Sequence, residues 1–248
     1  MNKLFLLDAY SLIYRAYYGL SRTPRINSKG MNTGAIFGFV NMLHEIISKG
    51  GATHLAVAFD HGKTFRHEAY PPYKAQRQET PEDIKKAVPY IKSILEAWHI
   101  PVLQADGYEA DDVIGAVATA MSKLTGADIA ACETETGQQT ADEKAENSVG
   151  DDKNVGQNET EKVSEDRQDG TDGMQKDAVS SAVETYMVTQ DKDYGQLVKP
   201  NVFIYKPHQH GGGYDVIGVK EVCQQFQVER PEQVADFLAL KGDSADNF

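Results

Sequence analysis

Two apolar runs in the first 60 residues each end in an aspartate. Lys3–Leu7 leads into Asp8, and His54–Phe59 leads into Asp60. Such runs are typical of strands in a buried parallel sheet, and ligands bind at the edge where those strands end. Either aspartate alone would be explained as a turn former. Because the pattern recurs in successive β–α units, we expect both carboxylates at one functional edge of an α/β fold.

A third cluster of acidic residues follows the apolar run Ile100–Leu103. Glu109, Asp111 and Asp112 stand at the start of a helix predicted to run to Leu124. Acidic side chains are favoured in a first helical turn, so a well-placed helix start alone would explain them. Further acids follow other predicted elements: Asp191, Asp193, Asp243 and Asp246. Carboxylates that converge repel one another unless hard cations neutralise them, so we predict a divalent-metal site if these positions meet.

The second half of the chain adds a predicted strand, Glu184–Thr189, before Asp191 and Asp193. In an extended segment the two carboxylates would point the same way, because side chains alternate along a strand. A short helix is predicted over 194–198, a strand over 202–206 and two amphipathic helices over 218–226 and 231–240. His208 and His210 are possible metal ligands, although a surface turn explains them better.

Residues 61–80 mix basic and aromatic side chains directly after Asp60. Basic groups bind phosphates, and aromatic rings stack on unpaired bases. An ordinary solvated connection is the alternative, but the position after a strand-end aspartate favours a phosphate-handling loop. Helices are predicted on either side of these units, over 10–20, 33–49 and 80–98, with Thr80 as the cap of the last.

The net charge of −12 is unusual for a nucleic-acid-binding protein. Residues 133–177, however, contain 14 acidic and five basic residues, which leaves −3 for the rest of the chain. Segment 132–182 lacks apolar periodicity, so we predict a disordered acidic insertion, with an acidic partner-binding segment as the alternative. Two cysteines indicate no disulfide framework, and no signal peptide or membrane span is recognised. We therefore expect a soluble, cytoplasmic protein without membrane contact.

Together these motifs resemble the 5′-nuclease domain of bacterial DNA polymerase I. The resemblance covers nearly all of the chain except about 132–182. Its motifs are Leu6-Leu7-Asp8 with Tyr14-Arg15-Ala16, Phe59-Asp60 with Lys63 to Arg66 and Tyr73 to Arg77, Glu109 to Asp112, Asp191 to Val198, and Gly242 to Asn247. Several motifs in one order are far more specific than any one of them. The resemblance implies an α/β fold of the PIN-like 5′-nuclease type, with a mostly parallel sheet, helices on both faces and a helical arch at 61–80.

The activity that the resemblance implies is a metal-dependent 5′→3′ exonuclease and flap endonuclease that acts in primer removal and repair. Its partners would be DNA with a 5′ flap or 5′ end and RNA primer–DNA hybrids. Two or more Mg²⁺ or Mn²⁺ ions would be held by two groups of carboxylates: Asp8, Asp60, Glu109, Asp111 and Asp112 for the first, and Asp191, Asp193, Asp243 and Asp246 for the second. Lys74 and Arg77 would be catalytic, steadying the scissile phosphate. DNA contacts would come from Arg15, Lys63, Phe65, Arg66, Tyr73, Lys74 and Arg77, with carboxylate orientation as the alternative role of Arg15 and Arg66.

The chain also departs from the family pattern. The acidic insertion takes the place of a short connection, and Phe248 ends the sequence before the family's helix–turn–helix element and its polymerase part. We therefore expect a C-terminally incomplete nuclease domain over 1–248 with a weakened grip on duplex DNA. The main alternative is a truncated remnant that binds DNA ends or a partner without cutting. A phosphotransferase is disfavoured because Tyr10 stands where its second acid is needed, and a small RNA-cleaving nuclease would not explain the arch.

Overall fold

A central sheet of six strands organises the computed structural model, which describes residues 2–124, 183–208 and 213–242. The strand order is β3-β2-β1-β4-β5-β6. β1 (Lys3–Asp8) lies in the middle and pairs in parallel with β2 (His54–Ala58) on one side and with β4 (Glu184–Val188) on the other. This confirms the predicted α/β class with a mostly parallel sheet.

The two edges of the sheet differ from the prediction. β3 (Val102–Leu103) is shorter than predicted, although it pairs in parallel with β2. β5 (Val202–Pro207) continues the parallel sheet beside β4, and β6 (Tyr214–Ile217) returns antiparallel to β5. The sequence did not predict β6, because four residues of mixed polarity beside a glycine-rich turn have no clear alternation.

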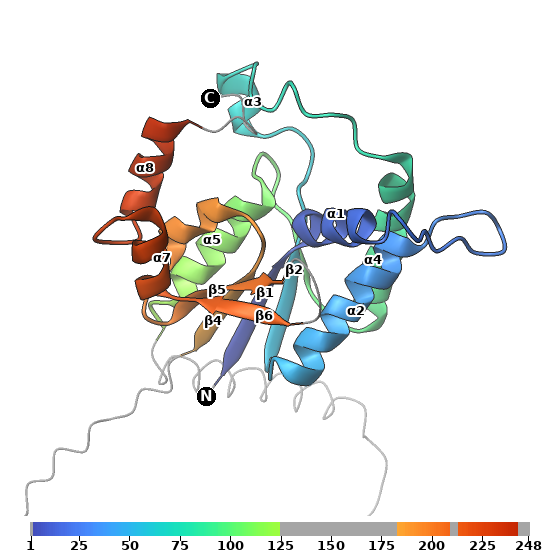
Figure 1. The fold of residues 1–248 in the computed structure, drawn as a ribbon, viewed down its shortest axis with the longest axis horizontal. Helices are drawn as coiled ribbons and strands as arrows, with labels where there is room; N and C mark the ends of the chain where they lie inside the picture. Colours follow the sequence, from blue (N-terminus) through green and yellow to red (C-terminus); the bar gives the residue numbers. More distant parts are fainter. Residues whose placement is uncertain (1, 125–182, 209–212, 243–248) are drawn as a thin grey trace, which may run out of the picture. The chain divides into compact units, whose positions relative to one another are not determined.

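Helices cover both faces of the sheet (Figure 1). Phe5 and Leu7 of β1 point to one face and Leu6 to the other, as strand geometry requires. The first face packs against α1 (Ala9–Gly19), α2 (Gly34–Lys49) and α4 (Glu82–Ala97). The second packs against α5 (Ala110–Met121), the 3-10 helix η1 (Lys192–Leu197), α7 (Val219–Phe226) and α8 (Gln233–Lys241). Within the described ranges, no helix has the length and apolarity needed to cross a membrane.

Carboxylates at strand ends also start the helices that follow. Asp8 caps α1 by accepting a hydrogen bond from Ser11 N at 3.1 Å. Asp191 caps η1 in the same way, accepting from Asp193 N at 3.0 Å. The expectation of an extended segment over 191–193 was therefore wrong, because a capping aspartate turns the chain into a helix at once.

The arch segment contains one short helix, α3 (Phe65–Ala69), followed by turns. Thr80 does not cap α4, which starts one residue after Pro81; its hydroxyl oxygen instead accepts a hydrogen bond from Tyr14 at 2.9 Å. Several predictions lie outside the described residues: the acidic insertion at 132–182, and the roles of His210, Asp243 and Asp246.

Candidate metal and phosphate site

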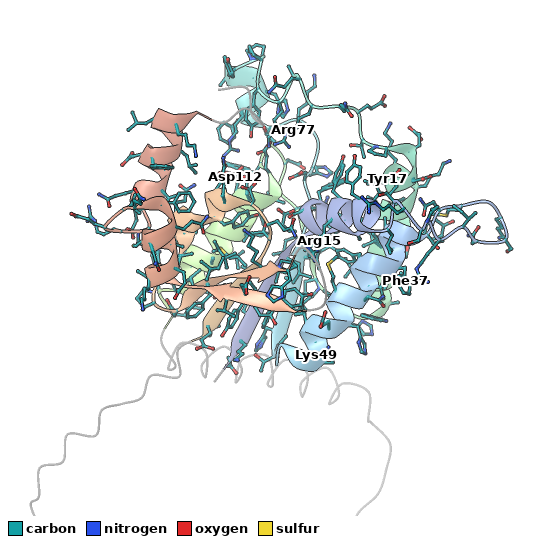
Figure 2. The ribbon with its side chains drawn as sticks, viewed as in Figure 1. Arg15, Tyr17, Phe37, Lys49, Arg77 and Asp112 are labelled. Carbon is teal, nitrogen blue, oxygen red and sulfur yellow. The ribbon has the colours of Figure 1, made fainter. Side chains whose placement is uncertain are left out.

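Four aspartates from distant parts of the chain meet around one cavity of about 690 Å³ at the carboxyl edge of the sheet. Asp8 comes from the end of β1 and Asp60 from the segment after β2, whereas Asp111 lies in the first turn of α5 and Asp191 follows β4. Glu109, Lys74 and Arg77 line the same cavity. In Figure 2, Arg77 and Asp112 lie toward one end of the molecule and Lys49 toward the other.

Two of these carboxyl groups hold their protons unusually tightly. Burial, together with the nearby charges of Asp60, Asp191 and Asp111, raises the pKa of Asp8 from 3.8 to about 7. Burial and the neighbouring carboxylate of Glu109 raise the pKa of Asp111 to about 6. Acidic side chains outnumber basic ones around this cavity, and their mutual repulsion adds to burial in disfavouring the ionised forms.

The start of α5 fixes part of this cluster through backbone hydrogen bonds. Ala110 N donates to Asp60 at 2.7 Å, and Glu109 N donates to Asp112 at 3.0 Å. Asp112 N donates to Asp111 at 2.7 Å. The helix-start explanation of the acidic residues is thus correct in part, and it also explains how the carboxylates are held in place.

Glu109 lines the cavity and also anchors the arch through hydrogen bonds with two of its side chains. Lys74 Nζ lies 2.9 and 2.8 Å from its two carboxylate oxygens, and Tyr73 donates its hydroxyl to the same carboxylate at 2.9 Å. Lys74 adopts a left-handed backbone conformation with φ of 55°, which is uncommon for a residue with a side chain. The ion pair offsets that strain and ties the turns after α3 to the acidic edge.

Arg66 forms a second link between the arch and the acidic edge. Its guanidinium binds Asp112 through two parallel hydrogen bonds of 2.6 and 2.7 Å, the geometry of a strong arginine–carboxylate pair. This pair holds the pKa of Asp112 below its usual range. Arg66, Asp111, Asp112 and Asp193 line a neighbouring cavity of about 550 Å³, so Asp111 borders both cavities.

The donor set fits a hard divalent cation, because the first cavity presents carboxylate oxygens and an excess of negative charge. Among residues 2–124, 183–208 and 213–242, no three side chains of the histidine, cysteine or acidic kind are close enough to form a shared ligand shell. Mg²⁺ keeps several of its waters when it binds protein. Carboxylates spaced around a wide cavity are compatible with such an ion held partly through water.

The structure distributes the predicted ligands differently from the two expected groups. Asp191 joins Asp8, Asp60 and Asp111 at the first cavity, whereas Asp112 turns to the second cavity together with Asp193. This division follows from local geometry, because η1 begins between Asp191 and Asp193 and separates their side chains.

The residues predicted to contact DNA differ in their exposure and in their position relative to the two cavities. Lys63 and Phe65 are exposed, and Arg77 is exposed at the first cavity. Tyr73 is only 4% exposed, so its ring has no open face for a base. Arg15 lies apart from both cavities and donates a hydrogen bond to the backbone carbonyl of His208.

Several polar residues that line the first cavity were not singled out from the sequence as site residues: Tyr10, Ser11, Tyr14, Gln78, Thr80 and Gln190. Ser11 accepts a hydrogen bond from Gln190 N at 3.2 Å, which joins the ends of β1 and β4. The proximity of Gln190 to Asp191 was the available sequence signal. Tyr14 belongs to one of the motifs of the resemblance, but its contact with Thr80 had no sequence signal, because only the packing of α1 against the start of α4 brings the two residues together.

Residues 3–160 match the family described as "5'-3' exonuclease, N-terminal resolvase-like domain". DNA polymerase I of Chloroflexus aurantiacus is 30% identical over 247 residues, which span 99% of this chain and 20% of that protein. The 5'-3' exonuclease of Aquifex aeolicus is 32% identical over 248 residues, which span 100% of this chain and 64% of that protein. The chain thus spans about a fifth of the first relative and less than two thirds of the second.

Solved structures of T5 nucleases share the fold. T5 5′-exonuclease with bound zinc has a TM-score of 0.56 at 18% identity, covering 99% of this chain and 69% of that chain. T5 D15 flap endonuclease, in a pseudo-enzyme-product complex with DNA and metal ions, has a TM-score of 0.55 at 17% identity, covering 99% and 68%. The sheet, the acidic edge and the sequence match agree: this chain belongs to the 5′-3′ exonuclease family, through its N-terminal resolvase-like domain.

Proposed function

We propose that this protein is a divalent-metal-dependent phosphodiester hydrolase, a 5′→3′ exonuclease and flap endonuclease that acts on DNA. One observation supports this most strongly: four aspartates separated by up to 183 positions, from Asp8 to Asp191, converge on a cavity that basic residues of the arch also line. Converging carboxylates opposite Lys74 and Arg77 suit a cation and a phosphate side by side. Membership of the exonuclease family supports the same reaction.

The chain's own residues would divide the work in the first cavity. Asp8, Asp60, Asp111 and Asp191 would hold Mg²⁺ or Mn²⁺, which fit oxygen ligands. When bound, such ions supply a water of lowered pKa and neutralise charge on the phosphate. A further ion would be held by Asp193, which lines the second cavity together with Asp111. Asp243 and Asp246, which lie outside the described residues, would be ligands of the same ion.

Lys74 and Arg77 would position the scissile phosphate. Lys74 is held in the cavity by Glu109, so its ammonium is oriented before substrate arrives. A preoriented cation loses little freedom on binding an anion, which favours catalysis. Glu109 would therefore serve mainly to place Lys74, and Arg66 to orient Asp112.

The substrate would be a 5′ end or 5′ flap of DNA, with RNA primer–DNA hybrid as a second substrate. The T5 D15 complex with DNA supports the first, and the DNA polymerase I relatives support a role in primer removal and repair. Such work would place the protein in the cytoplasm, where the chromosome is.

Cleavage of a labelled 5′-flap DNA tests the proposal directly. We expect cutting with Mg²⁺ or Mn²⁺, none in EDTA, and a loss of at least about 100-fold in Asp111→Asn, which removes charge from both cavities. Asp106→Asn is the matched control, because its side chain is 96% exposed and lies five positions before Asp111. This control should cut at the wild-type rate.

Cutting that persists in EDTA, or that is undiminished in Asp111→Asn, would refute the metal assignment. Absence of cutting, with flap binding retained by wild type and by both variants, would instead favour the alternative of a DNA-end-binding protein. Circular dichroism of each variant would show whether the fold is intact.

A further inference from the structure

Two aromatic rings stand exposed beside the acidic edge. The side chains of Phe65 and Tyr108 are 49% and 51% exposed, and their ring centroids lie 5.7 Å apart in an edge-on arrangement. Phe65 opens α3, and Tyr108 directly precedes Glu109. Single exposed apolar side chains need no explanation, but two rings in contact form a small apolar surface that a flat ligand can cover.

Both rings are mounted on fixed backbone. Phe65 N donates to Gly107 O at 3.1 Å, and Thr64, which is 2% exposed, forms a parallel bridge with Gly107. On the other side, Arg66 is held by its double hydrogen bond to Asp112. The backbone that carries both rings is therefore held in place, so a ligand that stacks on them does not have to order these two segments of the chain.

The neighbouring groups indicate which ligand suits the rings. The guanidinium carbon of Arg66 lies 4.7 Å from the centroid of the Phe65 ring, and Arg66 lines the second cavity. Lys74 and Arg77, on the same arch, line the first cavity. Aromatic faces flanked by cations match the flat bases and the phosphates of a single nucleic-acid strand. Tyr73, the other candidate ring of the arch, is buried and bonded to Glu109.

We propose that Phe65 and Tyr108 form a stacking site for an unpaired nucleobase next to the nucleotide whose phosphate enters the first cavity. The inference rests on the proposed function for the arrival of a strand, but it assigns Tyr108 a role that family membership does not. The site recognises the flat face of a base and not its hydrogen-bonding edge, so it tolerates any sequence. Its effect is to hold the strand in register with Lys74 and Arg77.

The competing explanation is that the two rings only pack the arch against the loop before α5. Substitutions at Tyr108 separate the two explanations. Tyr108→Phe keeps the aromatic face, whereas Tyr108→Leu keeps an apolar side chain for packing but has no face for stacking. Tyr90→Leu in α4 is the matched control, because Tyr90 is 56% exposed and lies outside both cavities.

The experiment measures binding of single-stranded DNA with calcium as the only divalent ion, with gels to show that the strand stays intact. One base at a time is replaced by 2-aminopurine, whose fluorescence falls when it stacks on an aromatic ring. A strand of equal length with abasic sites throughout keeps the phosphates but removes the bases. The same base sequence as RNA shows whether the sugar matters.

We expect quenching at one or two adjacent positions in wild type, Tyr108→Phe and Tyr90→Leu. Tyr108→Leu should lose this quenching and bind roughly tenfold more weakly, while its affinity for the abasic strand should equal that of wild type. Wild-type quenching and affinity in Tyr108→Leu would overturn the inference. Equal weakening on the abasic strand would also overturn it, because that result means the loop has repacked.

The readout separates this inference from the proposed function. Position-specific quenching in a protein that cuts no flap would leave the stacking site standing and refute the nuclease. Metal-dependent cutting with no effect of Tyr108→Leu on quenching would support the nuclease and overturn the stacking site.

Discussion

The raised pKa of Asp8 makes a quantitative prediction about stability. The folded protein binds the Asp8 proton more tightly than the unfolded chain does, so the free energy of unfolding must fall as pH rises through the window between the two pKa values. A rise from 3.8 to about 7 corresponds to about 4 kcal/mol lost between about pH 4 and pH 7. Burial is the main cause, followed in the same direction by Asp60, Asp191 and Asp111.

Urea unfolding in EDTA, at intervals from pH 4 to pH 8, tests this for wild type and Asp8→Asn. The variant has no proton to lose at this position, so the difference in stability between it and wild type should shift by about 4 kcal/mol in the variant's favour as pH rises. Asp106→Asn, with its exposed side chain, should follow the wild-type curve. Wild-type and Asp8→Asn curves that stay parallel across the window would refute the reasoning. Added Mg²⁺ should stabilise wild type increasingly as pH rises and most at pH 8, because the cation binds the ionised cluster.

Two further predictions concern packing between helices and the hydrogen bonding of tyrosine hydroxyls. A Cβ at Gly38 would lie 2.6 Å from Ala16 Cβ, so Gly38→Ala should lower the free energy of unfolding by about 1–3 kcal/mol. A Cβ at Gly19 would have no atom within 4 Å, so Gly19→Ala should leave the free energy of unfolding unchanged or raise it by up to about 1 kcal/mol. Urea unfolding compares the two variants, and equal effects would contradict the close approach of α1 and α2. The hydroxyl of Tyr194 is buried without a hydrogen-bond partner in the described part of the chain, so Tyr194→Phe should stabilise the metal-free protein by about 1 kcal/mol. Tyr14→Phe, which loses a bond to Thr80, should destabilise it, and thermal unfolding that ranks the two variants the other way would count against this account.

The central elements of the fold were predictable because their signals are local. Continuous apolar runs marked β1, β2 and β4, and terminal aspartates marked the functional edge. β6 was not predicted because it pairs with β5 across a hairpin, and a segment of four residues is too short to show the alternation of a strand. The extended conformation expected for 191–193 failed because a capping carboxylate competes with the strand.

The gathering of acidic residues at one edge was predictable, but their grouping and contacts were not. Strand ends indicated that Asp8 and Asp60 would meet, whereas Asp191 was expected in a second group with Asp193; the structure places Asp191 at the cavity of Asp8 and Asp60. No sequence signal pointed to the contact of Lys74 with Glu109, and the expectation that Arg66 could orient a carboxylate did not identify Asp112. Both contacts join segments 35 to 46 positions apart through the geometry of the arch. The exposure of Tyr108 and the burial of Tyr73 likewise depend on tertiary packing.

The position of β1 has a consequence for the nascent chain. β2 pairs with one side of β1 soon after both are made, but the other side waits for β4, which begins at Glu184. At about 5–20 residues per second, the ribosome needs on the order of ten seconds to travel from Ala58 to that point. Throughout this delay one side of the central strand lacks its native partner, and an exposed strand edge of this kind can pair with another chain. Asp191 arrives only after β4, so until then the nascent chain lacks the fourth aspartate of its first cavity, and the proposed metal site is incomplete.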